Sequence, residues 1–411
     1  MMLFLILTAT VTCNLFRPRA DARLDAMRRQ GFPVTLSELD QWYPAVSDSQ
    51  NNARIYERAF GLPGFGRFGR FGDIKWPDPG PALSARDKKD LMELVMANQG
   101  ALALLHSAQA SNRCRYSIDL TKLFPETGHH FNVLNGVLLL GAEALVDADN
   151  GDSQQTIGSF MAGGMLADSL AEEPVLIAQI TRDAGWNLIV RRLEHALALT
   201  QMTEEQLASL QAMAEKAEQP RAMLRGLAGE RAWGIALFSD PVMILQDRPP
   251  YNTTECLKND MIIASSKSTG VFDMDQTFYL NALARSVAAA SLSFPGRVNL
   301  GQQTPGVAPP FCILSRRILP RISATFTSEA ITAARLRAAQ VALAVERFRC
   351  RHGGKLPATL EELVPVYCKA LPADPFTGDQ LSFQELDSGY AIYSSRTDPR
   401  NGGPLGFRIF R

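Results

Sequence analysis

The feature that most constrains the fold is a long run of amphipathic helical patterns between Ser84 and about Asp240. Apolar residues recur three and four positions apart, as they do on one face of an α-helix. Short polar breaks ("DADNGD", "EEP" and "EQP") separate the patterns. Helices joined by short loops pack antiparallel. The sequence therefore predicts a helical bundle or an irregular helical-repeat array over residues 84–240.

Caps and apolar stripes mark the individual helices of this region. Ser84 with Asp87, and Thr203 farther along, are N-cap residues that precede a first helical turn. No strict period of about 34 residues is present, which makes a regular repeat protein the second choice. The stripes comprise Leu91, Leu94, Val95, Leu102 and Leu105; Leu134, Leu138, Gly141 and Leu145; Ile177, Ile180, Ala184 and Leu188; and Leu207, Leu210, Ala214 and Ala217.

The tail, residues 327–411, changes pattern from a long helix to strands. The runs "LSFQEL" and "YAIYSS" are separated by "DSG", which predicts a hairpin with a short turn, and "GFRIF" follows. We expect a mainly α protein with a small C-terminal α+β module, a long helix packed on a short antiparallel sheet. The helix seam is Ala334, Ala338, Val341, Val345 and Phe348, with Arg335, Arg337, Arg347 and Arg349 off it.

The other segments are less regular. Residues 17–60 are expected to form short N-terminal helices, and residues 61–83, rich in Gly, Pro and Phe, a linker or an ordered surface loop. Residues 241–326 form an irregular region with one helix, at 276–290. The 411 residues exceed the usual size of a single domain, so two or three units are expected.

Residues 1–16, "MMLFLILTATVTCNLF", carry no charge. As a helix they would span about 24 Å, which is short of the roughly 30 Å hydrocarbon core of a bilayer. This length is typical of an export signal or a marginal membrane anchor, and a buried N-terminal helix is the alternative. We expect a membrane-anchored or exported protein that faces the periplasmic or extracytoplasmic side.

The skeleton Pro-x-Thr-Leu-x-Glu-Leu-x-x-x-Tyr occurs twice, at residues 33–43 and 357–367. In each copy Thr-x-x-Glu predicts a capping box, in which the glutamate returns to the amide of the cap residue. We interpret the phrase as a structural unit used twice. Cys350 and Cys368 flank the second copy, and both a disulfide and two separate buried thiols remain open.

The phrase "GFGRFG", residues 64–69, matches the dinucleotide fingerprint letter for letter but lacks the flanking strand and helix that this fingerprint requires. Alternating Phe and Arg at 65–71 could stack nucleic-acid bases. Basic and acidic residues both number 42, however, so no net field attracts nucleic acid. We expect a loop docked by its phenylalanines, with no nucleotide cofactor and no nucleic-acid partner.

Two sequence patterns resemble metal-binding motifs, but the spacing of their ligands does not suit a metal ion. His129 and His130 are adjacent, and neighbouring residues point about 100° apart on a helix, so they are not expected to bind one ion. The stretch "DADNGD" has glycine at the fifth ligand position of a calcium loop and Gly158 in place of the bidentate glutamate. We predict no metal site.

The tail also resembles the soluble head of the major pseudopilins of type II secretion, a type IV pilin-like fold. The resemblance covers about the last 85 residues and implies a long helix on a small antiparallel sheet and an extracytoplasmic setting. The matching residues are Phe348, Gly354-Lys355-Leu356-Pro357, Leu371-Pro372-Ala373-Asp374-Pro375-Phe376, Gly378, Gly389-Tyr390, Ile392-Tyr393-Ser394 and Asp398.

Two family properties are not expected to transfer. The calcium loop of the family has two glycines that are replaced within Tyr393–Pro399 here, and the pilin membrane helix is missing from the front of the module. Neither calcium binding nor filament assembly is therefore implied. The whole chain also resembles uncharacterised exported bacterial proteins, a class that supplies no activity.

No nucleophile elbow, zinc-protease helix or Walker loop is present in the sequence. We assign no catalytic, cofactor or metal residues and expect an exported or membrane-tethered scaffold that binds unknown envelope proteins. One alternative is a degenerate component of a secretion apparatus. Another is an envelope hydrolase with a site in the helical domain. Its lining would include Asp119, Glu126, His129 and Glu230, the last within the unusual phrase "GERAWG", where a buried hydrogen-bonding pair is expected.

Overall fold

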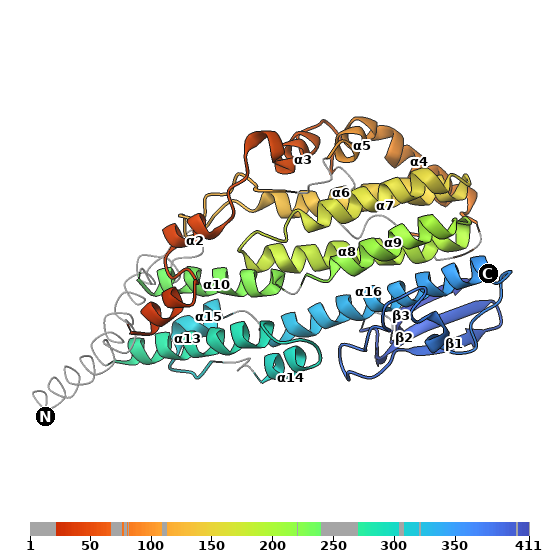
Figure 1. Cartoon of the computed structure of the whole chain (residues 1–411). Helices are drawn as coiled ribbons and strands as arrows, with labels where there is room; N and C mark the ends of the chain where they lie inside the picture. The colour runs from red at the N-terminus through yellow and green to blue at the C-terminus, as the bar shows by residue number, and fades with distance from the viewer. Residues whose placement is uncertain are drawn as a thin grey trace, which may run out of the picture.

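The structure is a computed structural model of the chain, in which the helices lie in stacked layers with a small sheet beneath one end (Figure 1). The N-terminal apolar segment, residues 1–16, lies outside the part described. The described residues are 22–66, 76–77, 80, 82–108, 113–219, 221–239, 270–303, 308–319, 322–399 and 402–410.

The helical mass predicted from the apolar stripes is confirmed. Ser84 caps its helix by accepting a hydrogen bond from the amide of Asp87 (3.1 Å), and Thr203 forms a capping box with Gln206. The helices of this region are α4 (Ala85–Ala97), α5 (Gln99–His106), α6 (Gly128–Asp149), α7 (Ser153–Asp168), α8 (Leu176–Leu199), α9 (Glu204–Ala217) and α10 (Ala222–Ser239), and they are preceded by the shorter α2 (Leu36–Trp42) and α3 (Asn52–Phe60).

One stretch of this region is not helical. Residues 113–127 form turns and irregular backbone, and within them Asp119 accepts a hydrogen bond from the amide of Thr121 two residues on (3.1 Å), an Asx turn that competes locally with a helix. Tyr116 and Leu120 from this stretch are buried. The prediction of nearly unbroken helix was wrong here, and the stretch brings Tyr116 against the first turn of α6.

The following region holds more helix than expected. The single helix predicted at 276–290 is α13 (Val271–Ala290), which begins earlier, and α14 (Gly296–Gln302) and α15 (Ile313–Ile318) follow. Helix α13 packs on α10, α14 and α15, and their apolar residues form a second core.

The tail has the predicted architecture. Helix α16 (Ile322–Arg351) is followed by a 3-10 turn at Leu360–Leu363 and by a three-stranded antiparallel sheet. Leu386 pairs with Gly389 at the end of the hairpin, where a short turn was predicted. The strands are β1 (Ser382–Leu386), β2 (Gly389–Thr397) and β3 (Pro404–Phe410), in the order β1-β2-β3.

Helix α16 is the centre of the molecule rather than the edge of a tail module. It contacts α8 and α9 on one side and β2 and β3 on the other (Figure 1). The predicted seam residues Val341, Val345 and Phe348 are all buried, but so are Leu336 and Leu343 on other faces. The predicted apolar stripe was therefore too narrow. It assumed that one neighbouring element packs on this helix, whereas two layers cover it. One hydrophobic core runs from α3 through α9 into α16 and the sheet.

The repeated phrase forms a similar unit in both places. Glu38 accepts the amide of Val34 (2.8 Å), and Glu362 accepts the amide of Ala358 (3.0 Å), so each glutamate caps the residue before the threonine rather than the threonine itself. Only Thr35 accepts a backbone amide in return. The tyrosine that ends each copy is buried. These contacts are local packing.

The structure does not join Cys350 to Cys368. The sulfur of Cys350 lies 4.0 Å from the carbonyl of Met202, and that of Cys368 lies 3.9 Å from the carbonyl of Leu363. Among the described residues one helix, α6, is long and apolar enough to cross a membrane, but most of it is buried in the protein's own core.

Candidate functional site

A cleft of about 890 Å³ lies where α6 and α8 meet the tail sheet. Its volume falls within the range of roughly 300–1,000 Å³ that small-molecule sites occupy. Arginines dominate its charged groups, and we call it the arginine cleft. Its charged residues are Arg191, Arg192, Arg335, Arg408, Glu194 and Asp398.

Asp398, at the end of β2, anchors the cleft. Its carboxylate Oδ2 lies 3.0 Å from the guanidinium of Arg191 on α8 and 2.5 Å from that of Arg335 on α16. The backbone of Asp398 is fixed by a hydrogen bond to the carbonyl of Gly403 (2.7 Å). Two guanidinium groups therefore surround the carboxylate of Asp398.

Arg192 is held differently from Arg191, because consecutive helical residues point about 100° apart. Its guanidinium lies over the ring of Trp76, 3.6 Å from the ring centroid. Its stem passes over Gly141 of α6, where a Cβ would come within 3.1 Å of the Arg192 Cγ. Among the described residues no carboxylate pairs with Arg192. Burial and the charge of Arg191 lower the pKa of Arg192 to about 9.

Glu194 adds little negative charge to the cleft. Its Oε1 accepts the backbone amide of Arg408 (3.0 Å), yet burial raises the pKa of Glu194 to about 7. Near neutral pH this carboxyl group is therefore protonated in a large fraction of molecules. Among the described residues of the cleft, four arginines stand against one aspartate and one glutamate, so basic side chains outnumber acidic ones. Guanidinium groups bind carboxylate and phosphate through paired N–H donors.

A second polar cleft, of about 570 Å³, lies between α8, α9, α14 and α16. Three of its four arginines are neutralised by partners within the chain: Arg182 by Asp168 (2.7 Å), Arg297 by Glu329 (2.5 Å) and Arg337 by Glu218 (2.8 Å); the fourth is Arg221. Pairs of this kind hold helices in register. The arginine cleft is thus the stronger candidate for binding a ligand.

The four residues of the hydrolase alternative are not gathered around one cavity. Asp119 and Glu126 are exposed, and Asp119 bonds to Thr121 beside it. Glu230 lines a mostly apolar cavity of about 270 Å³, and His129 contacts Glu173 instead.

The phrase "GERAWG" does not form the expected polar pair. Glu230 is half-buried in the apolar cavity, and burial raises its pKa to about 7. The guanidinium of Arg231 lies over the ring of Phe32, 5.0 Å from the centroid. The hydroxyl of Tyr279 donates to the backbone carbonyl of Glu230 (2.7 Å). The phrase joins α10 to its neighbours through packing and through hydrogen bonds to the backbone, since the indole N–H of Trp233 also donates to the carbonyl of Leu123.

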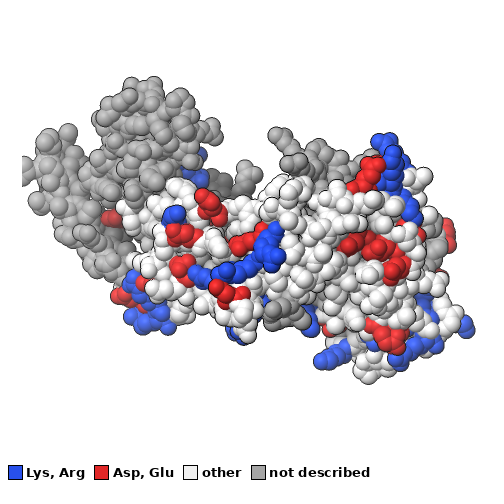
Figure 2. Space-filling model, turned by 90° about the horizontal axis from the view of Figure 1, so that it is seen from above, with Lys and Arg blue, Asp and Glu red and all other residues white. Residues whose placement is uncertain are grey.

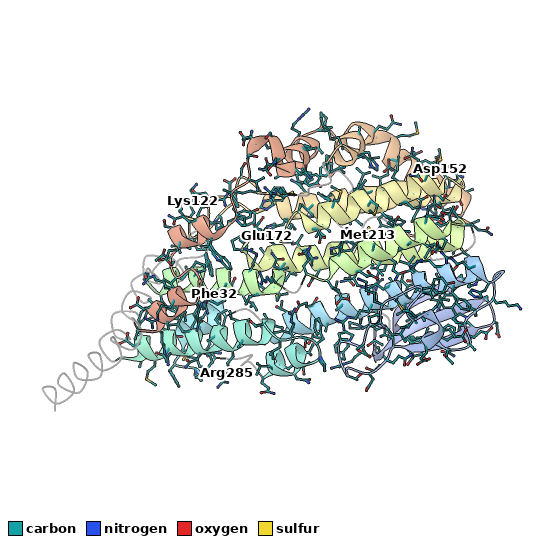
Figure 3. The ribbon with its side chains drawn as sticks, in the orientation of Figure 1. Phe32, Lys122, Asp152, Glu172, Met213 and Arg285 are labelled. Atoms are coloured by element: carbon teal, nitrogen blue, oxygen red, sulfur yellow. The ribbon has the colours of Figure 1, made fainter. Side chains whose placement is uncertain are left out.

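The two adjacent histidines converge, contrary to the expectation from helical geometry. Nε2 of His129 lies 2.8 Å from one oxygen of Glu173, and Nε2 of His130 lies 2.6 Å from the other. The expectation rested on the angle of about 100° between neighbouring residues on a helix. It fails because the two imidazole side chains, in the first turn of α6, bend toward a common acceptor. The loop of Lys122 and the turn of Glu172, next to Glu173, lie at this end of the bundle (Figure 3).

The phenylalanine-rich loop is described only at its start. Phe65 packs on Phe60, with ring centroids 5.2 Å apart, and contacts the main core. Phe68, Phe71, Arg67 and Arg70 lie outside the described residues. On the face seen in Figure 2, basic and acidic side chains of the described residues are interspersed.

No family model, no curated protein and no solved structure matches this chain. What the arginine cleft does is therefore argued from its own geometry.

Proposed function

We propose that the protein is a binding scaffold of the cell envelope that holds a small anionic ligand, bearing a carboxylate or phosphate group, in the arginine cleft. The observation that carries the proposal is Arg192, a half-buried cation for which the described chain supplies an aromatic ring but no carboxylate, and whose buried Nε has no hydrogen-bond partner among the described residues. An incoming anion would supply the missing partner.

The energetics favour an added anion. A cation removed from water is costly unless it is paired, and a cation–π contact contributes only about 0.5–2 kcal/mol. The pKa of about 9 for Arg192 reports this uncompensated cost. A ligand carboxylate or phosphate facing Arg192 and Arg408 would relieve it through charge-assisted hydrogen bonds.

The cleft also explains how binding could act on the whole molecule. Its walls come from α6, α8, α16 and the strands β2 and β3. A ligand seated there would link the helical region to the tail. The envelope setting is supported by the apolar residues 1–16 and by the resemblance of the tail to pseudopilins.

Calorimetric titration of the purified protein with phosphate, citrate and succinate tests the binding proposal. We expect at least one of these anions to bind, and Arg192→Gln to weaken that binding at least about tenfold, as expected for loss of a charged hydrogen bond. Arg86→Gln is the control, because Arg86 lies on the exposed face of α4. Absence of binding by all three anions, or equal affinities for wild type and Arg192→Gln, would overturn the proposal.

Cell fractionation tests the proposed location in the cell envelope separately from ligand binding. The full chain should appear in the membrane or periplasmic fraction, and a chain without residues 1–16 should remain in the cytosol. Recovery of the full chain in the cytosol would contradict the envelope assignment and leave the binding result unaffected.

A further inference from the structure

The cluster formed by His129, His130 and Glu173 presents three metal-ligating groups to one point. One ligand atom from each residue lies within 4.8 Å of the other two. Glu173 is fully buried, His130 is 5% exposed and His129 is half-buried. The two imidazole rings lie close together, with centroids 4.2 Å apart.

The surrounding contacts fix these three side chains. Tyr116 stacks on His129, with ring centroids 4.4 Å apart, and its hydroxyl bonds to Ser169 (2.7 Å). The side-chain amide of Gln179 donates to the backbone carbonyl of Glu173 (2.7 Å). Supporting contacts that orient each ligand are a property of metal sites in proteins.

The simpler explanation is a buried carboxylate that accepts two hydrogen bonds. Burial acts to raise the pKa of Glu173, but the bonds from His129 and His130 prevail and lower it, so the group is ionised. This explanation accounts for the charge of Glu173 but does not engage the buried Nδ1 atom of His130, which has no hydrogen-bond partner among the described residues and which a metal held through Nε2 would not engage either. It also gives no reason for two imidazoles to share one carboxylate.

We propose that His129, His130 and Glu173 bind a divalent transition-metal ion, with zinc the best match. Two imidazole nitrogens and a carboxylate oxygen are a ligand set that zinc accepts, and three protein ligands leave a fourth position for water. A tetrahedral zinc ion with bonds of about 2.0–2.1 Å holds its ligand atoms roughly 3.4 Å apart. The closest pairs here, at 2.8 and 2.6 Å, need to separate by less than about 1 Å.

The cluster lies next in sequence to residues that line a cavity. Thr127, two residues before His129, and Pro174, next to Glu173, both line the cavity of about 270 Å³. Lys122 lines the same cavity and is exposed.

Titration with cobalt tests the proposal on the full chain after treatment with a chelator. Cobalt should bind one ion per chain and give the visible absorption of a tetrahedral site, and zinc should displace it. His130→Gln and Glu173→Gln should each weaken cobalt binding by more than about tenfold, because losing a ligand should cost at least as much as losing a residue that merely orients one.

His106→Gln is the matched control. His106 also contacts a glutamate, Glu143, at 2.6 Å, but no second imidazole joins that pair. This variant should bind cobalt as the wild type does. Absence of stoichiometric cobalt and zinc binding by the wild type, or unchanged affinity in both cluster variants, would overturn the proposal.

A measurement on the wild type covers the case in which the cluster variants do not fold. The chain has five histidines. In nitrogen NMR spectra of histidine-labelled protein, one equivalent of zinc should shift the side-chain signals of two of them and leave the signal of His106 unchanged. Zinc that shifts no pair of histidine signals, or that shifts His106, would contradict the site.

Discussion

At the scale of single residues, Glu230 gives a pH dependence with a definite sign. Burial raises its pKa from 4.5 to about 7, so the folded protein holds a proton that the unfolded chain has released. Stability from this group is present below pH 4.5 and is lost as the pH rises through 7. We expect Glu230→Gln to be the more stable protein at pH 8, by about 1–3 kcal/mol after allowance for partial exposure, with little difference at pH 4.5.

Denaturant unfolding of both proteins at pH 4.5 and 8 measures this difference. Burial also raises the pKa values of Asp183 and Glu194 to about 7. The pH dependence of stability that these two groups contribute is the same in variant and wild type, so it cancels in the comparison. A difference in stability that does not change with pH would contradict the burial of Glu230 in an apolar cavity.

Gly141 leaves room for the side chain of Arg192. A Cβ at Gly141 would lie 3.1 Å from the Arg192 Cγ, so the branched side chain of valine would displace the arginine. Gly141→Val should lower the free energy of unfolding by about 1–3 kcal/mol, as overpacking does, and should weaken anion binding. Gly158→Val is the control, because nothing lies within 4 Å of a Cβ at that helical glycine. Equal effects of the two substitutions on stability and on anion binding would contradict the packing of Arg192.

At the scale of elements, the apolar seam of α16 is the most directly testable packing prediction. Val345 on α16 is fully buried, and Val366 is 61% exposed. Val345→Ala should cost about 2–3 kcal/mol in the free energy of unfolding, from lost burial and a residual cavity. Val366→Ala should change it by less than about 0.5 kcal/mol. Similar losses for both valines would contradict the burial of the α16 seam at Val345.

Helices and the hairpin were predictable because their signals are local. A cap such as Ser84, or the turn before Gly389, depends on residues a few positions away. The number of layers on α16 was not predictable, because periodicity shows which face is apolar but not how many partners cover it. The stretch 113–127 was missed because an Asx turn competes with a helix at similar composition.

The candidate sites were harder to predict than the elements. The arginine cleft joins Arg192 to Trp76 and Arg191 to Asp398, pairs far apart in the sequence. Its only local signal is a pair of arginines between Val190 and Leu193, inside an otherwise apolar part of α8. The histidines were noticed, but their common partner Glu173 lies beyond another whole helix, so angular spacing alone gave the wrong geometry.

At the scale of the whole molecule, one hydrophobic core joins the helical region to the tail. We expect α8, α9, α16 and the sheet to unfold in a single transition, because each covers apolar surface of the next. Thermal unfolding followed by far-ultraviolet circular dichroism and by tryptophan fluorescence should give coincident midpoints. Two separated transitions, with the tail melting alone, would contradict the shared core.

The central claim is that Arg192 in the arginine cleft binds an anion from outside the chain. The most direct measurement is an anomalous difference map from crystals of the full chain that contain selenate. The predicted result is a peak within hydrogen-bonding distance of the Arg192 guanidinium, beside Trp76. A cleft without selenate, or a carboxylate of the chain itself paired with Arg192, would contradict the claim.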